Sequence, residues 1–161
     1  MSWESRSRRS LDMKALVAVL GFLFAGCASG GLIGAVPLVP DPTQAATVVV
    51  VRPYSILGSG RAPTITVDGL ETYDLGPGEH VVMAVAPGDR IVGIKIWEVV
   101  TWRTAVKIQA VAGHAYYFLM AWGPQFVEIT ENEGRAIMAK TTPVQDNAWK
   151  GQAERPDGSR Q

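Results

Sequence analysis

The stretch from Ala46 to Pro53 reads ATVVVVRP and indicates the fold class more directly than any other part of the chain. Residues 47–51 are all β-branched, which favours extended backbone, and Arg52-Pro53 ends the run. Because the valines are continuous rather than alternating with polar residues, we expect a strand that is covered on both faces. No later segment shows a sustained helical period, so the fold is expected to be all-β.

Short apolar runs separated by Gly and Pro follow this strand along the chain. The runs predict strands over residues 63–67, 81–86, 91–97, 106–111, 116–122, 126–130 and 135–140. The turns are marked by Asp68-Gly69, Pro77-Gly78, Pro87-Gly88 and Gly123-Pro124, and by residues 132–134 before the last strand. This rhythm is typical of a single small antiparallel β-sandwich, or a partly open barrel, over residues 46–142. Residues 143–161 are polar and are expected to form a disordered tail.

The N-terminal part of the chain carries an apolar run, residues 15–25, that ends at Gly26-Cys27. About eleven residues suit the core of a signal peptide and fall short of the roughly twenty that cross a bilayer as a helix. Phe24-Ala25-Gly26-Cys27 resembles the lipobox of bacterial lipoproteins, with Phe24 where leucine is commonest. The resemblance implies cleavage between Gly26 and Cys27 and acylation of Cys27, by palmitate among other chains.

With cleavage before Cys27, the chain divides into a signal peptide (1–26), a lipidated tether (27–45), the β-sandwich and the tail. A compact signal would begin at Met13, so we expect the true start there, or an extended leader over residues 1–12. Ala28 follows the cysteine, which by resemblance to enterobacterial sorting favours the outer membrane, facing the periplasm, with the inner membrane as the alternative. The predicted partners are the membrane, through the acyl chains, and an envelope protein or the cell wall.

A membrane-spanning helix is the alternative to a cleaved signal. Residues 15–40 carry no charge, and Gly26, Gly30 and Gly34 have the four-residue spacing of a helix-packing face. Pro37 and Pro40 weigh against a continuous helix. A single-pass membrane-anchored domain with an uncleaved N-terminal helix is therefore the alternative prediction.

Charge and cysteine content exclude several classes of protein. The 161-residue chain is formally neutral, and residues 27–161 hold eleven Lys and Arg against thirteen Asp and Glu. A basic nucleic-acid face is therefore not expected. With its only cysteine acylated, the mature chain would have no thiol for a disulfide or a thiolate metal site. We predict no cofactor and no metal.

Several short motifs occur in the order typical of a bacterial lipoprotein family described as domain of unknown function 2846. They are Val48 to Pro53, Gly58 to Gly60, Pro63, Ile65, Val67, Asp68-Gly69, Leu75-Gly76, residues 86–90 (APGDR) and residues 113–117 (GHAYY). The chain resembles that family over roughly residues 46–140, except that Arg90 stands where the family commonly has His, while His80 follows the earlier Pro-Gly turn. The resemblance implies a β-sandwich-like periplasmic domain and assigns no activity.

Residues that could carry catalysis are few. No Gly-x-Ser-x-Gly elbow occurs, and His80, His114, Asp68 and Glu79 lack the spacing that places metal ligands on one face. These four are interpreted as polar residues beside turns. An enzyme would need a cleft around His80 or His114, and we expect a non-enzymatic module instead.

Exposed aromatic residues give the alternative of a small ligand-binding domain. Trp102, beside Arg103, lies in a segment where the strand alternation breaks, and the loop 54–61 carries Tyr54 and Leu57 between strands. Aromatic side chains of this kind can stack on glycan or peptide. These four residues are the predicted binding surface.

Overall fold

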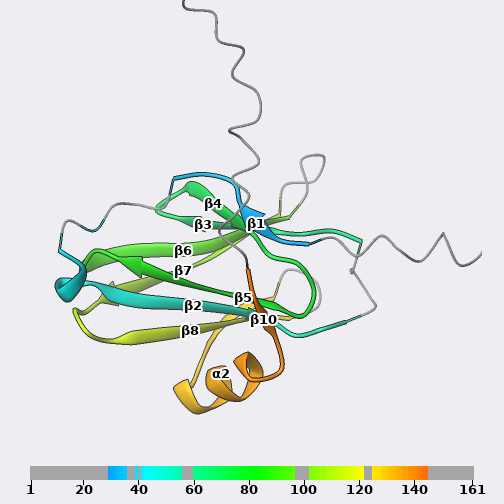
Figure 1. Cartoon of the computed structure of the whole chain (residues 1–161). Helices are drawn as coiled ribbons and strands as arrows, with labels where there is room; N and C mark the ends of the chain where they lie inside the picture. Colours follow the sequence, from blue (N-terminus) through cyan, green and yellow to red (C-terminus); the bar gives the residue numbers. More distant parts are fainter. Residues whose placement is uncertain are drawn as a thin grey trace, which may run out of the picture.

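Within the residues that the structure describes, strands form two five-stranded sheets packed face to face (Figure 1). The structure is a computed structural model that describes residues 29–35, 39, 41–55, 60–96, 102–121 and 125–144, with the side chains of Trp102 and Arg103 outside the described part. The strands are Gly31–Leu32 (β1), Ala46–Arg52 (β2), Thr64–Val67 (β3), Leu70–Asp74 (β4), Glu79–Val85 (β5), Gly88–Ile96 (β6), Trp102–Ala110 (β7), Ala115–Met120 (β8), Phe126–Ile129 (β9) and Thr142–Pro143 (β10). The predicted all-β sandwich is confirmed, and the sheets do not close into a barrel.

The two sheets differ in the direction of their strands. The first, in the order β1-β4-β3-β6-β7, is antiparallel throughout. The second, in the order β10-β5-β2-β8-β9, is mixed, because β2 runs parallel to β8 and β10 runs parallel to β5. The expectation of a purely antiparallel sandwich therefore holds for the first sheet only.

The valine run forms β2, at the centre of the second sheet, and is buried on both faces as predicted. Val48 and Val50 are fully buried between the sheets. Val49 and Val51 point the other way and pack with Tyr117 in a second apolar cluster. Burial of each such side chain stabilises the fold by about 2 kcal/mol.

The core between the sheets draws on nearly every strand. Phe118 of β8 and Phe126 of β9 stack on each other in this core, with ring centroids 5.1 Å apart. The same core contains Ala46, Val48, Val50, Ile65, Val67, Tyr73, Leu75, Val81, Met83, Val85, Val92, Ile94, Ile108, Ala110 and Met120. The strand alternation of the sequence thus places one apolar face of each sheet inward.

The Asp68-Gly69 turn joins β3 to β4, a strand that the sequence analysis did not delimit. Both turn residues have positive φ, 50° at Asp68 and 82° at Gly69, as a tight two-residue hairpin requires. β4 pairs with β3 through a register shift between Ile65 and Thr66. Thr72 is fully buried there, and its hydroxyl donates to the carbonyl oxygen of Ile65 at 3.1 Å.

Residues 135–140 do not form the predicted last strand, because Glu131–Met138 is a helix, α2. Thr130 caps this helix: its hydroxyl accepts from the N–H of Glu133, whose carboxylate accepts from the N–H of Thr130. This capping box satisfies backbone donors that the first turn leaves unpaired. The predicted strand over 126–130 is confirmed as β9, which pairs with β8 rather than with residues 135–140.

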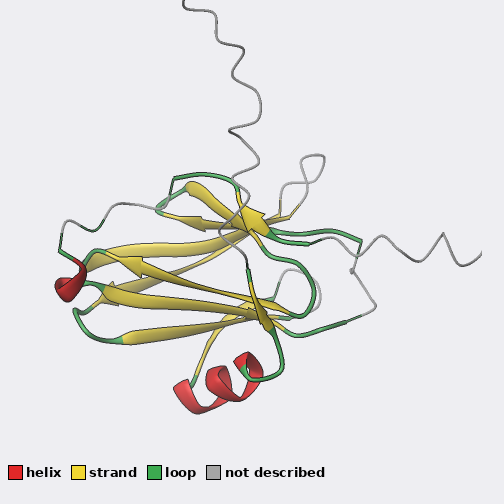
Figure 2. Ribbon diagram, viewed as in Figure 1, coloured by secondary structure: helices red, strands yellow, loops and turns green. Residues whose placement is uncertain are grey.

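α2 lies on the side of the second sheet that faces away from the first, beneath β8 (Figures 1 and 2). Ile137 and Met138 pack on the cluster of Val49, Val51 and Tyr117. Gly134 is the buried residue of the helix and lies directly against the Tyr117 ring, where a Cβ would overlap the ring atoms. The helix therefore supplies the cover that the second face of β2 needs.

Residues of the predicted tether and tail also join the sheets. Gly31 and Leu32, within 27–45, form β1 against β4, and a short 3-10 turn over Pro42–Gln44 (η1) leads into β2. Pro143 ends β10, after which the N–H of Val144 donates to the carbonyl oxygen of His80. Residues 145–161 lie outside the described part of the chain.

We predict that Gly134→Ala lowers the free energy of unfolding by about 2 kcal/mol, because the new methyl group overlaps the Tyr117 ring. The steric cost outweighs the gain of about 1 kcal/mol that Ala brings to a helix. Urea titration measures the change. Asn132→Ala, at an exposed position of the same helix, is the control and should change little. Unaltered stability of Gly134→Ala would contradict this packing.

Candidate functional site

Tyr54 and the backbones of Trp102 and Arg103 lie at one end of the sandwich, which we call the Glu79 end. It is the end at which β2 finishes at Arg52, β4 at Asp74 and β6 at Ile96, and at which β5 begins at Glu79. Arg52 pairs with Glu79 across the second sheet, and Ile96 pairs with Trp102 across the first. Connections that leave this end come from both sheets, so residues far apart in sequence meet there.

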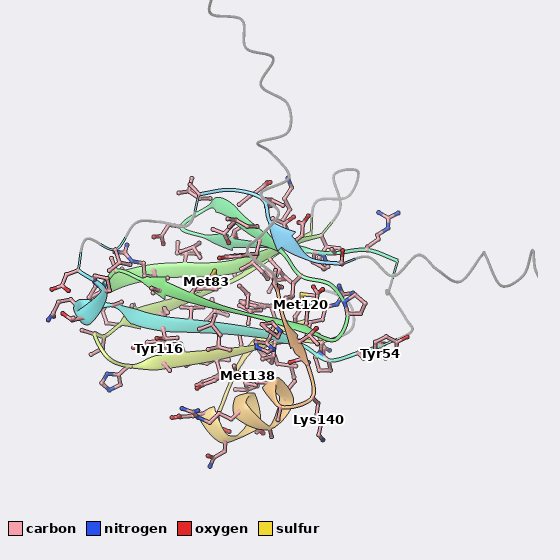
Figure 3. The ribbon with its side chains drawn as sticks, viewed as in Figure 1. Tyr54, Met83, Tyr116, Met120, Met138 and Lys140 are labelled. Atoms are coloured by element: carbon pink, nitrogen blue, oxygen red, sulfur yellow. The ribbon has the colours of Figure 1, made fainter. Side chains whose placement is uncertain are left out.

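Tyr54 follows β2 at the Glu79 end and is exposed, with 65% of its surface accessible. It lies beside Gly78, in the turn that precedes Glu79. Figure 3 shows Tyr54 at one end of the strands and Tyr116, near the start of β8, at the other. Tyr54 is therefore available to a partner at the Glu79 end.

The structure describes the other predicted binding residues only in part. The backbone of Trp102 lies opposite Ile96, and that of Arg103 opposite Lys95, so both stand at the Glu79 end of β7. The register runs unbroken to this pair, without a bulge in the described part of the hairpin. Leu57, Gly26 and Cys27 lie outside the described residues. Topology thus brings Trp102 to the same end as Tyr54.

Glu79 holds the N-terminal segment against this end, a role that sequence reasoning missed. Its Oε2 accepts from the backbone N–H of Gly30 at 2.8 Å and from that of Gly76 at 2.6 Å. Beyond Gly30, Gly31 pairs with Asp74 and Leu32 with Tyr73 in the short β1–β4 ladder. A carboxylate that accepts two N–H groups makes strong charge-assisted hydrogen bonds. Gly30 and β1 are therefore fixed to the sandwich.

Arg52 ties the two sheets together next to Glu79. One guanidinium nitrogen, Nη1, donates to the carbonyl oxygens of Arg61 at 2.8 Å and Leu75 at 2.7 Å. Burial lowers the pKa of Arg52, and the negative charge of Glu79 opposes that change. Arginine stays charged at neutral pH, so Arg52 and Glu79 form a paired set of opposite charges. This arrangement fixes both ends of the connection that carries Tyr54.

The two histidines lie at opposite ends of β2. Val51 pairs with His80, whereas the N–H of Thr47 donates to the carbonyl oxygen of His114. His114 is exposed and His80 is 8% exposed. Among the described residues, no group of three or more His, Cys, Asp or Glu comes together as a metal site. The two histidines therefore do not share one site.

His80 fastens the segment after α2 to the second sheet. Its Nδ1 lies 2.8 Å from the hydroxyl oxygen of Thr141, and that hydroxyl is within 3.3 Å of the carbonyl oxygens of Ile137 and Met138. Since the hydroxyl has a single proton to give to the helix, Nδ1 acts as the donor. Burial lowers the pKa of His80 below its usual 6.5, so the neutral ring is favoured.

The outer face of the first sheet carries a shallow hollow above Gly93. It has a volume of about 150 Å³ and is lined by Thr66, Gly69, Glu71, Ile91, Lys95 and Ala105, among others. Lys95 and Glu71 form an ion pair of 2.7 Å at its rim. Pockets for small ligands usually measure about 300 Å³ or more, so this hollow is small for such a role.

We predict that Glu79→Ala releases the N-terminal segment, because Gly30 and Gly76 lose their shared acceptor. The amide protons of Gly31 and Leu32 should then exchange with solvent faster, by a factor of about 10 for each 1.4 kcal/mol lost. Hydrogen exchange with residue-level detection measures this. Glu79→Gln is the control, since its side-chain oxygen still accepts. Equal protection in Glu79→Ala and the parent chain would show that Glu79 does not hold β1.

We also predict that acid lowers the stability of the fold through His80, because burial disfavours the charged ring. The folded pKa of His80 is below the unfolded value, so the unfolded chain takes up the proton first. The contribution of neutral His80 to the free energy of unfolding is complete above about pH 7.5. It is lost as the pH falls through about 6.5 towards the folded pKa of His80. Thermal unfolding across this range should show a smaller decrease in Tm for His80→Gln than for the parent chain. His114→Gln, at the exposed histidine, should retain the parent's pH dependence.

A scan against protein-family models gives no match for this chain, and a search of the curated proteins gives none either. The resemblance to domain of unknown function 2846 therefore stays a prediction from short motifs. Function has to be inferred from the residues themselves and from their geometry.

Proposed function

We propose that this chain is a lipid-anchored envelope protein whose β-sandwich acts as a non-enzymatic structural or interaction module. The observation that carries the proposal is the sequence from Lys14 to Cys27, a short apolar run that ends in Phe-Ala-Gly-Cys. Diacylglyceryl transfer to the thiol of Cys27, cleavage just before it and acylation of the new amino terminus would give a multiply acylated chain. Several acyl chains hold a protein stably at a membrane, whereas one gives marginal binding.

The position of β1 favours this anchor over an uncleaved membrane-spanning helix. Gly31 and Leu32 pair with β4 as a strand, so an uncharged helix from Ala15 would have to end by Gly30. That leaves sixteen residues, fewer than the roughly twenty that a bilayer requires.

The location that we propose is the outer membrane, with the sandwich facing the periplasm. Ala28 after the cysteine supports this by resemblance to enterobacterial sorting. The exposed aromatic side chain at the Glu79 end supports an interaction role, because exposed aromatic groups are enriched where proteins meet partners. The partner would be an envelope protein or the cell wall.

Acylation is tested on the protein expressed with its own signal in a bacterial host. Intact-mass spectrometry should show a chain that begins at Cys27 and carries diacylglyceryl and N-acyl groups, and the protein should sediment with the outer membrane. Cys27→Ala should lose both acyl groups and remain uncleaved at this site. Ser29→Ala, two residues on, is the control. A wild-type chain with residues 1–26 still attached and the Cys27 thiol free would refute the proposal.

Recognition of glycan or peptide is a second candidate, favoured by the placement of exposed Tyr54 and of the Trp102 backbone at the same end of the sandwich. Titration with soluble peptidoglycan fragments, monitored by tryptophan fluorescence, tests it. Tyr54→Ala and Trp102→Ala should each weaken binding by about tenfold, the effect of losing about 1.4 kcal/mol of stacking. Val111→Ala, exposed at the opposite end, should bind normally. Binding that is indifferent to both aromatic residues would exclude this surface.

A further inference from the structure

We infer that the Glu79 end is the membrane-facing end of the sandwich, with Tyr54 at the level of the lipid headgroups. The inference rests on the proposed acylation of Cys27 and adds an orientation to it, in which the exposed Tyr54 contacts lipid rather than an envelope protein or the cell wall. An acylated chain on a long tether could present any face to the bilayer. The described contacts of Gly30 remove that freedom.

The first step is the reach of the chain between the lipid and the sandwich. Gly30 is fixed by its hydrogen bond to Glu79 and by the β1–β4 ladder that follows it. Only three residue steps separate Cys27 from Gly30. At full extension they span about 11 Å, so the acyl chains enter the bilayer within that distance of Gly30.

The second step is the length of the sandwich along its strands. β6 and β7 are nine residues each, about 30 Å from one end to the other. Val111 directly follows β7, at the end far from Glu79. With a reach of about 11 Å, that end cannot face the bilayer in place of the Glu79 end while Gly30 stays docked. The Glu79 end is therefore held next to the lipid.

The third step is the chemistry of the residues presented there. Tyr54 is largely exposed, and tyrosine is enriched at membrane interfaces because its ring is apolar and its hydroxyl is polar. Arg61, also exposed, lies on the same connection and adds a positive charge. A cation close to an anionic bilayer is favoured. Asp41 and His114 are exposed at the opposite end instead.

Nitroxide labels at the two ends test the orientation. Acylation consumes the thiol of Cys27, the only cysteine in the chain, so Tyr54→Cys or Val111→Cys supplies the single reactive thiol. The mature acylated protein is reconstituted in vesicles of phosphatidylethanolamine and phosphatidylglycerol. Collisions of the label with oxygen, which enters lipid, and with a water-soluble nickel complex are then compared. We expect position 54 to lose nickel accessibility and gain oxygen accessibility on reconstitution, and position 111 to keep its values.

A lengthened tether separates the orientation from the anchor. A flexible Gly-Ser insertion of about twelve residues after Ala28 adds about 40 Å of reach and leaves the docked segment intact. The labels at 54 and 111 should then become equally accessible to nickel. Equal accessibility without the insertion, in a protein that mass spectrometry shows to be acylated, overturns the orientation and leaves the anchor standing. A chain without acyl groups overturns the anchor, and the orientation with it.

Discussion

Burial of β2 on both faces is the constraint on which the rest of this fold depends. Val48 and Val50 need a second sheet on one side, and Val49 and Val51 need α2 on the other. Four consecutive valines do not by themselves define a register, since a slip by one residue would still place valine on each face. The register is fixed by Arg52, whose guanidinium group reaches the carbonyl oxygens of Arg61 and Leu75. A slip would bury this charge without those acceptors, at considerable cost.

The same residue connects the core to the surface at which function is proposed. Arg52 stands opposite Glu79, and Glu79 accepts from Gly30, so the central strand and the N-terminal segment share one cluster of charges and hydrogen bonds. The orientation of the exposed Tyr54 connection is fixed by the same cluster. Core register, loop position and docking of the N-terminal segment are therefore coupled rather than independent properties.

Sequence reasoning recovered most of the fold because strand signals are local. The valine run, the Asp68-Gly69 turn and the strand over 126–130 all follow from neighbouring residues, and each is confirmed. β4 was not delimited, because its buried Thr72 breaks the expected apolar alternation and needs the carbonyl of Ile65 as its partner. The prediction of a turn over 132–134 and a strand over 135–140 is wrong, although Thr130 and Glu133 have the spacing of a capping box, a local signal for the helix α2.

The candidate site is harder to predict from the sequence, since it depends on contacts between residues far apart in the chain. Glu79 and Gly30 are 49 positions apart, and no local pattern links them. Tyr54 and Trp102 were singled out separately as exposed aromatic residues. That they stand at one end follows from strand order and direction, which a sequence without homologues does not supply.

The parallel pairing of β2 with β8 has a consequence for the order in which the chain is assembled. Val50 pairs with Phe118, so β2 stays without this neighbour until the polypeptide has been made, or moved through a membrane pore, past Met120. During that interval a stretch of bare valines, of the composition that seeds intermolecular β-stacking, is open to solvent. The chain is therefore prone to aggregation until β8 is available to pair with β2. During that interval the exposed valines are the kind of segment that a holding chaperone would bind.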